Sequence, residues 1–438
     1  MSDLRSVASC DQENGGSCSC RSAESAPPEI VRNRGAPSAE VSGVEAVSAN
    51  DSGGGASSRR VVRRVKGSAN KRNVIPDSIL KNEGLNQAIS ILPANYNFEI
   101  HKTIWRIQSE KANLVALQFP EGLLMYSCVI ADILSKWGRT KVIILGDVTY
   151  GACCIDDFSS QKLGADLLIH YGHSCLVPIG VTRIKVMYVF VEIKFDESHL
   201  IQCLTNAFSS DTKMAIMGTI QFTSVVYAAH AQLKSQFPQA IIPQAKPLSG
   251  GETLGCTAPV LENVDILVFV ADGRFHLEAA MIRNPKVKAY RYDPYGKKIT
   301  HESYDIEKMK SIRKRAITKA QGCHTFGLVL GTLGRQGNLA IFQRIRGLLR
   351  SKGKKLVPFL MAEINPVKLE LMDGIDAWVQ VACPRLSIDW SDGFDKPILT
   401  PYELEVAMKE TVWKEVYPMD FYANEGTPWS AMSMQRRS

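Results

Sequence analysis

The chain has 438 residues, of which 45% are hydrophobic and 22% are charged, and its formal net charge is +8. This length and composition predict a globular protein of about two to four domains. No apolar run approaches the roughly 18–20 residues that a membrane span needs, and residues 1–12 lack the apolar stretch of a secretory signal. We therefore expect a cytoplasmic protein with no membrane contact. The mild positive charge is too small to argue for direct nucleic-acid binding.

Residues 1–72 have the composition of a disordered tail. Glycine-, serine- and proline-rich runs with few aromatic residues cannot bury enough surface to offset the entropy lost on folding. The basic run that ends this tail, 59–72, has two interpretations: a solvated linker, or a nuclear-import or RNA-contact sequence. Cys18 and Cys20 are spaced too tightly for the usual metal-ligand loops, so we expect no metal there.

After residue 72, strand-like and helix-like patterns alternate, which predicts three parallel α/β domains. The first, 73–203, is expected to hold strands at 113–119, 141–147, 166–171 and 185–193 and helices at 121–137 and 156–163. The second, 204–312, is expected to hold strands at 213–222, 239–244, 265–272 and 286–292 and helices at 224–237, 257–263 and 275–284. The third, 313–438, includes a C-terminal extension and is expected to hold strands at 325–331, 355–363 and 376–383 and helices at 339–352 and 366–372. The strands are short and continuously apolar, so helices should cover both faces of each sheet.

The three domains also repeat one another in sequence. The strings GADLLIH (164–170), NVDILVF (263–269) and GIDAWVQ (374–380) occupy equivalent places. Such internal similarity predicts related domains, here in a pseudo-threefold arrangement around a central site. In parallel sheets, ligands bind beyond the carboxyl ends of the strands, so residues just after the strands are the candidates.

Three cysteines occupy such places, one in each domain: Cys153, Cys256 and Cys383. Soft thiolate ligands select zinc, copper(I) or iron–sulfur centres. Zinc sites usually carry ligand pairs two to four residues apart, and no C-x₂-C occurs after residue 72. If they meet, these three thiols would hold a 4Fe-4S cluster with one iron left open for a substrate. The alternative is that each is a small buried apolar residue.

The other cysteines have less informative surroundings. Cys128 is expected on the inner face of the first predicted helix, and Cys203 and Cys323 also have the surroundings of structural residues. Cys154, next to Cys153, should point away from it if the loop is extended. Cys175 lies at a strand end near the expected site, and its role stays open.

Charged and histidine side chains are expected at the same edge of the sheets. Arg335, Arg385 and Lys246 lie in or beside glycine- or proline-containing turns, where they could bind an anionic group or form loop-stabilising ion pairs. His173 and His276 follow strands and are expected to be hydrogen-bonded structural residues.

A series of longer motifs points to a known family. The strings are QFPEG (118–122), GDVTYGACCIDD (146–157), YGHSC (171–175), GCTAP (255–259), DGRFH (272–276), YDPY (292–295) and ACPRLSID (382–389). In this order they resemble the family that carries out the first step of diphthamide synthesis, and most closely its eukaryotic catalytic subunit. The resemblance covers about residues 75–415 and leaves the tail outside.

This resemblance implies an enzyme that transfers the 3-amino-3-carboxypropyl group of S-adenosylmethionine to the imidazole C2 of a histidine in translation elongation factor 2. It implies a radical mechanism, with a 4Fe-4S cluster whose ligands map onto Cys153, Cys256 and Cys383. The chain lacks the C-x₃-C-x₂-C loop of ordinary radical S-adenosylmethionine enzymes. The implied partners are a paralogous subunit in a heterodimer, a small zinc protein as electron donor and a J-domain helper.

Two other functions stay open at this point. A subunit whose site has decayed could act as a catalytically silent scaffold, although the complete set of three cysteines favours activity. An iron–sulfur dehydratase similar to quinolinate synthase could use the same triplicate architecture and three-cysteine cluster, although the loop motifs disfavour it.

Overall fold

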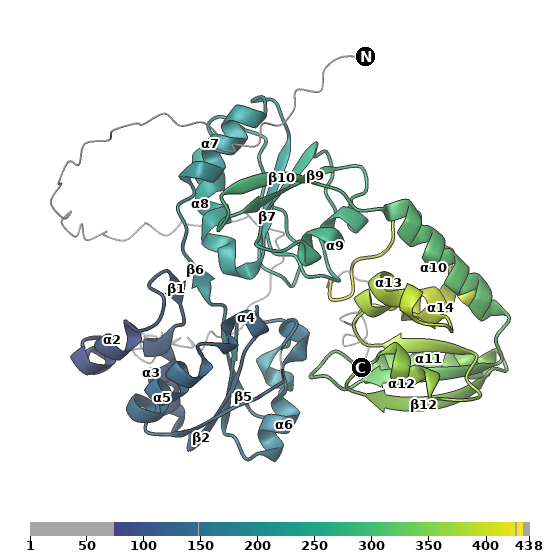
Figure 1. Cartoon of the computed structure of the whole chain (residues 1–438), viewed down its shortest axis with the longest axis horizontal. Coiled ribbons are helices and arrows are strands. Elements are labelled where there is room, and N and C mark those ends of the chain that lie inside the picture. Colours follow the sequence, from purple (N-terminus) through teal and green to yellow (C-terminus); the bar gives the residue numbers. More distant parts are fainter. Residues whose placement is uncertain (1–73, 148, 425–426, 432–438) are drawn as a thin grey trace, which may run out of the picture. The chain divides into compact units, whose positions relative to one another are not determined.

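The computed structural model describes residues 74–147, 149–424 and 427–431 (Figure 1). The predicted tail, 1–72, with its basic run and Cys18 and Cys20, lies outside the described residues. The described part is a mixed α/β structure built mainly on three four-stranded sheets. None of the helices in this part is both long enough and apolar enough to span a bilayer.

The first four-stranded sheet is entirely parallel. Its strands are β2 (Leu114–Gln118), β3 (Lys141–Ile144), β4 (Leu167–Tyr171) and β5 (Lys185–Val189), in the order β3-β2-β4-β5. Strand β4 is buried along its whole length, as its continuous apolar sequence predicts.

The sheet nearest the C-terminus repeats this topology. Its strands are β11 (Thr325–Gly331), β12 (Lys355–Met361), β13 (Ala377–Val381) and β14 (Ile398–Leu399), in the order β12-β11-β13-β14. In both sheets the second strand along the chain lies at one edge and the first and third form the centre, which is the arrangement expected of related units.

The middle sheet follows the same order with two differences. Its strands are β7 (Met214–Gly218), β8 (Ile266–Val270), β9 (Lys288–Asp293) and β10 (Lys298–Glu302). Strand β10 is antiparallel to β9 and extends the sheet. The predicted strand at 239–244 is reduced to one parallel bridge between Ile241 and Ala215, which occupies the edge where β3 and β12 lie in the other sheets.

Helices precede, connect and follow the strands (Figure 1). In the first third of the described chain they are α1 (Asp77–Leu80), α2 (Glu83–Ile89), α3 (Ile100–Glu110), α4 (Glu121–Leu124), α5 (Ser127–Gly138) and α6 (Asp157–Lys162). Those that follow are α7 (Ser198–Ala207), α8 (Thr223–Leu233), α9 (Phe275–Arg283), α10 (Ile306–Gln321), α11 (Leu339–Ser351), α12 (Pro366–Glu370), α13 (Arg385–Trp390) and α14 (Pro401–Ala407). A two-stranded ribbon pairs β1 (Tyr96–Asn97) with β6 (Glu192–Ile193).

An aspartate joins two neighbouring strands of each four-stranded sheet in the same way: β2 with β4, β7 with β8, and β11 with β13. In each case its Oδ2 accepts one or two hydrogen bonds of 2.7–3.1 Å from backbone N–H groups at the start of the earlier strand. The aspartates are Asp166, Asp265 and Asp376. Two residues before each stands a residue with positive φ, namely Gly164, Asn263 and Gly374. This left-handed turn, which glycine and asparagine tolerate, explains the shared sequence pattern.

The structure differs from the sequence prediction in several elements. The predicted helix at 257–263 is wrong, because this segment is an irregular loop whose backbone bonds to residues near 420. The elements that were not predicted are α1, α2, α3, α7, α10, α13 and α14 and the strands β1, β10 and β14. Cys128 is exposed and does not lie on the inner face of its helix. The domain limits and the pseudo-threefold arrangement stay predictions.

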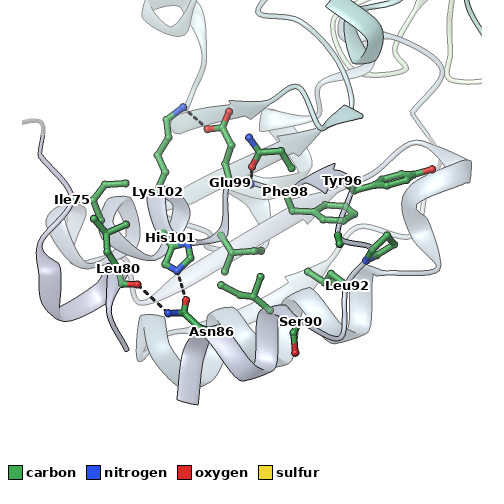
Figure 2. A pocket seen from close by; sticks show the side chains of 15 residues that line it. Ile75, Leu80, Asn86, Ser90, Leu92, Tyr96, Phe98, Glu99, His101 and Lys102 are labelled. Atoms are coloured by element: carbon green, nitrogen blue, oxygen red, sulfur yellow. Dashed lines mark hydrogen bonds and ion pairs between the residues drawn. The ribbon is translucent and has the colours of Figure 1, made fainter. Parts of the chain in front are cut away.

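A pocket of about 710 Å³ lies among α1, α2, α3 and β1 (Figure 2). Its floor is apolar, with Leu92 and Phe98, and on its rim a ring nitrogen of His101 lies 2.7 Å from Oδ1 of Asn86. None of its lining residues belongs to the loops that carry the three candidate cysteines. It is therefore not the candidate site.

A fully buried ion pair joins α10 to α14. The Arg313 guanidinium donates to both carboxylate oxygens of Glu403, at 2.6 and 2.7 Å, and neither side chain is exposed. Arg313 also donates to the carbonyls of Ser387 and Ile398, each at 2.6 Å. Every polar contact of this arginine is thus directed to the last sheet and its helices, which it ties together.

We expect Arg313→Met to lower the free energy of unfolding by about 3–5 kcal/mol, because it leaves the Glu403 carboxylate buried without its partner. Arg313→Met combined with Glu403→Gln should recover much of this loss. Denaturant unfolding followed by tryptophan fluorescence measures both. The control is Lys81→Met, whose partner Asp77 is exposed and whose loss should not move the midpoint. A single variant that unfolds at the wild-type midpoint would contradict the assignment.

Candidate functional site

The three candidate cysteines lie on loops that follow strands of three different sheets. Cys153 lies in a 3-10 turn, η2 (Ala152–Cys154), after β3. Cys256 lies in the loop before β8, where Leu254 and Thr257 bridge each other. Cys383 comes two residues after β13. The structure therefore places all three where the carboxyl-edge argument expects them.

These thiols share one neighbourhood. Burial, with a contribution from nearby Cys383, raises the pKa of Cys256 to about 12. A hydrogen bond with Cys154 and burial hold the pKa of Cys153 well above its usual value, and Cys383 and Cys256 add to the rise. Burial raises the pKa of Cys383 to about 11, against the lowering effect of the backbone N–H and the charge of Arg385. Without a bound cation, all three are neutral thiols near pH 7.

The described residues contain no group of three or more His, Cys, Asp or Glu side chains placed so that it could hold a metal ion. The three sulfur atoms are near enough to influence one another electrostatically, but they do not form a compact ligand set. Their role as ligands is taken up below as a proposal.

Cys154 differs from its expected position. Because η2 is a tight turn and not an extended loop, the adjacent thiols of Cys153 and Cys154 interact. The hydrogen bond with Cys153 lowers the pKa of Cys154 to about 7, although burial opposes the shift. Cys154 is buried, and its sulfur also accepts from Nε2 of Gln336 at 3.3 Å.

The loop 334–336, from the last sheet, holds the Cys153 loop in place. The N–H of Arg335 donates to the Cys153 carbonyl at 2.8 Å. Gly334 has φ +53°, and a Cβ atom there would lie 2.4 Å from the carbonyl carbon of Cys154. Glycine is thus required both for the backbone conformation and for the close approach of the two loops.

Arg335 forms an ion pair. Its guanidinium donates to both oxygens of the buried Asp157 carboxylate, at 2.8 and 2.6 Å, and lies 4.1 Å from the centre of the Phe158 ring. Burial acts to raise the pKa of Asp157, but Arg335 and the N–H of Arg183 together lower it below its ordinary value. Of the two roles considered for Arg335, the structure favours loop stabilisation.

Arg385 stabilises the Cys256 loop in a similar way. It donates to the carbonyls of Gly255 and Phe275, at 3.2 and 2.8 Å, and forms ion pairs with Glu278 and Asp389 at 2.5 and 2.7 Å. Arg385 connects the loop of Cys383 to the loop of Cys256.

A segment near the C-terminus, residues 417–424, completes the site; we call it the C-terminal strap. Its backbone pairs with the Cys256 loop: the N–H of Phe421 donates to the Cys256 carbonyl at 3.3 Å, and the N–H of Tyr422 donates to Oγ1 of Thr257 at 3.0 Å. Burial and the three candidate cysteines raise the pKa of Tyr422 well above its usual value, and its hydroxyl interacts with Cys153. Nothing in the local sequence pattern marks Tyr422, so this residue was not predicted.

A pocket of about 680 Å³ adjoins these loops. Its lining residues include Arg335, Gln336, Asn338 and Tyr422. The other candidates lie elsewhere or have structural contacts. Lys246 contributes its carbonyl to the strap by accepting from Asn424, and Cys175 is exposed.

Comparison with known proteins identifies the family. The family model for diphthamide synthesis proteins matches residues 119–418. The chain belongs to this family. It is 52% identical over 369 residues to the human 2-(3-amino-3-carboxypropyl)histidine synthase subunit 1, covering 83% of this chain and 84% of that protein. The subunit 1 proteins of Schizosaccharomyces pombe and Dictyostelium discoideum are 51% and 50% identical, over 83% and 84% of this chain and 85% and 80% of their own lengths.

Solved structures of this diphthamide synthesis family have a similar fold. The crystal structure of Dph2 from Pyrococcus horikoshii with a 4Fe-4S cluster superposes with a TM-score of 0.63 and 26% identity. It covers 74% of this chain and 94% of that one. The family model ends at 418, so most of the C-terminal strap, including Tyr422, lies beyond the segment it matches.

Gly334→Ala should loosen the Cys153 loop, because the added methyl group cannot fit against Cys154. We expect alkylation of Cys153 and Cys154 to become about tenfold faster, the factor that about 1.4 kcal/mol makes in an opening equilibrium. Mass spectrometry of the alkylated peptide in the cluster-free chain measures the rate. Gly353→Ala is the matched control, since Gly353 also has positive φ but faces open space. Equal rates in both variants would refute the close-packing argument.

The ion pair of Arg335 with Asp157 predicts a pH dependence. Because the folded pKa of Asp157 is lowered, its stabilising contribution is complete above the ordinary aspartate value, near 4, and is lost as the pH falls through the lower folded value. Arg335→Leu should therefore destabilise the fold most above about pH 4, and the difference from the wild type should shrink in acid. Thermal melting from pH 3 to 7 tests this. Lys368→Leu, which breaks an exposed pair, should show almost no difference at any pH.

Proposed function

We propose that the chain is the cluster-bearing subunit of a transferase that moves the 3-amino-3-carboxypropyl group of S-adenosylmethionine to the imidazole C2 of a histidine in translation elongation factor 2. The observation that carries this proposal is that three thiols from three sheets share one neighbourhood in a member of the diphthamide synthesis family. Overall, a carbon–sulfur bond of the donor breaks, methylthioadenosine leaves, a bond forms at C2, and C2 loses a proton.

Cys153, Cys256 and Cys383 would hold a 4Fe-4S cluster. These residues fit such a cluster, because neutral thiols would release their protons to solvent when a cationic iron centre binds their sulfur atoms. Each of the three cysteines would supply one thiolate, the ligand type that holds iron–sulfur clusters in proteins. When bound, the cluster supplies the electron that opens a carbon–sulfur bond of the donor.

The surrounding residues have a positioning role in this proposal. The loop 334–336, Arg385 and the C-terminal strap fix the backbones of the cysteine loops, so that the thiols are pre-organised before a ligand binds. The pocket lined by Arg335, Gln336 and Tyr422 is the place we assign to the donor, since Tyr422 also contacts Cys153. Its apolar and ring-bearing wall would exclude water from the reacting atoms.

The relatives also support a proposal about the partners of the chain. Their name, subunit 1, supports assembly with a second subunit, which we propose to be a paralogue. A zinc protein as electron donor, a J-domain helper, a cytoplasmic location and a pseudo-threefold arrangement of the three domains belong to the same proposal. The common strand order and the repeated aspartate contacts support the last point.

The test replaces each proposed ligand. Cys153→Ser, Cys256→Ser and Cys383→Ser should each lower bound iron well below the about four atoms per chain of a complete cluster and abolish release of methylthioadenosine. Iron analysis and chromatography of the anaerobic complex measure these quantities. Cys128→Ser, at an exposed position, is the control and should match the wild type. If all three serine variants keep iron and transfer activity, the assignment fails; a wild-type complex without iron would indicate a scaffold instead.

A further inference from the structure

Two motifs contain histidines that have no role in the proposed function. His173 lies two residues after β4, in YGHSC, and His276 lies at the start of α9, in DGRFH. Both are half-buried, whereas His170 in β4 is completely buried. His170 and His173 belong to a hydrogen-bonded chain that begins at the Cys153–Cys154 turn, whereas His276 influences His173 electrostatically.

Gln118 fixes the direction of this chain. Its Nε2 donates to the Cys154 carbonyl at 3.0 Å, and its Oε1 accepts from the N–H of Asp156 at 3.2 Å. Both backbone partners have an unambiguous polarity, so the orientation of the amide is determined. The Oε1 of Gln118, which can only accept, lies 2.9 Å from Nδ1 of His170.

The tautomers of both rings follow. Nδ1 of His170 must donate to Gln118, and burial holds the pKa of His170 well below its ordinary value, so this ring is neutral and its Nε2 accepts. Nδ1 of His173 lies 3.1 Å from that atom and must therefore donate. Burial also lowers the pKa of His173 to about 3, with a contribution from His276 and against the raising effect of a hydrogen bond with the Tyr171 backbone, so this ring is neutral. With its one proton on Nδ1, its Nε2 is bare.

His173 is linked to the cysteine site by a row of interacting groups. His276 lowers the pKa of His173, and Arg385 lowers that of His276. Arg385 in turn acts on Cys256 and Cys383. The carbonyl of Gly172, next to His173, accepts from Nε2 of Gln221 at 2.6 Å, which holds the turn in position.

Building on the proposed function, we propose that Nε2 of His173 is the binding point for the acceptor histidine: it accepts a hydrogen bond from the N–H of the substrate imidazole. C2 lies between the two ring nitrogens, so anchoring one nitrogen fixes where C2 points. The anchor selects a neutral imidazole with an N–H donor, and the Gln118–His170 chain keeps the anchoring atom free of a proton. His173 is thus a positioning residue for the acceptor.

The tautomers can be measured directly. In the full chain with ¹⁵N-labelled histidines, two-bond ¹H–¹⁵N spectra should show His173 and His170 protonated at Nδ1 and bare at Nε2. His173→Gln and His170→Gln assign the signals by their disappearance. A proton on Nε2 of His173 would overturn the proposal, because that atom could not then accept.

Matched variants separate positioning from structure. His173→Asn keeps an N–H donor near the Nδ1 position, and so the bond to His170, but has no atom at Nε2. His173→Gln places an amide near Nε2. With elongation factor 2 as the substrate, we expect His173→Asn to raise the KM for the acceptor by about tenfold to a hundredfold, the effect of an unpaired buried donor, with a much smaller change in the donor KM. His173→Gln should recover part of the loss. His324→Asn, at an exposed position, is the control and should match the wild type.

The outcomes distinguish this inference from the function on which it rests. An unchanged acceptor KM in His173→Asn overturns the inference and leaves the transferase intact. Equal losses in both His173 variants, together with lowered melting temperatures, indicate a structural histidine and also overturn it. A wild-type complex that cleaves the donor but modifies no elongation factor 2 refutes the acceptor assignment and the inference together.

Discussion

Two arginines that connect loops far apart in sequence are the constraint on which the site depends. Arg335 reaches Asp157 beside the Cys153 turn, and Arg385 joins the loop of Cys383 to that of Cys256. A guanidinium presents several N–H donors in a rigid plane, so one side chain can satisfy a carboxylate and several carbonyls at once. Together with the backbone contacts of the C-terminal strap, these side chains hold loops from different sheets in one neighbourhood.

The three sheets combine a shared frame with loops that differ. The frame is the strand order and the aspartate that ties β4 to β2, β8 to β7 and β13 to β11, with its left-handed turn two residues earlier. The loops differ in their place along the chain, since Cys153 and Cys256 come before β4 and β8, whereas Cys383 comes after β13. The repeated strand order thus carries different side chains on its loops. Two loops carry Cys153 and Cys256, a third carries Cys383 and Arg385, and His173 and His276 also follow strands.

The C-terminal strap shows how this member of the diphthamide synthesis family completes its site. Its backbone pairs with the Cys256 loop, and Tyr422 meets Cys153, so one short segment contacts two of the three candidate ligands. The buried pair of Arg313 and Glu403 anchors the helices that precede the strap. Stability of the last sheet and order at the cysteine site are therefore connected through the chain itself.

The sequence alone determined the strand-rich α/β class, the three candidate cysteines and the family, because these depend on local hydrophobic patterns and on ordered motifs. The sequence could not determine the conformation of residues 257–263. Their apolar residues suggested a helix, but in the structure this segment is a loop that pairs with residues near 420. Nor could it predict that the thiols of Cys153 and Cys154 contact each other. The contacts of Gln118 and Tyr422 and the tautomer of His173 could not be predicted either. These depend on contacts between residues tens to hundreds of positions apart, and a side chain acquires its hydrogen-bonding partners only when tertiary packing brings them within about 3 Å.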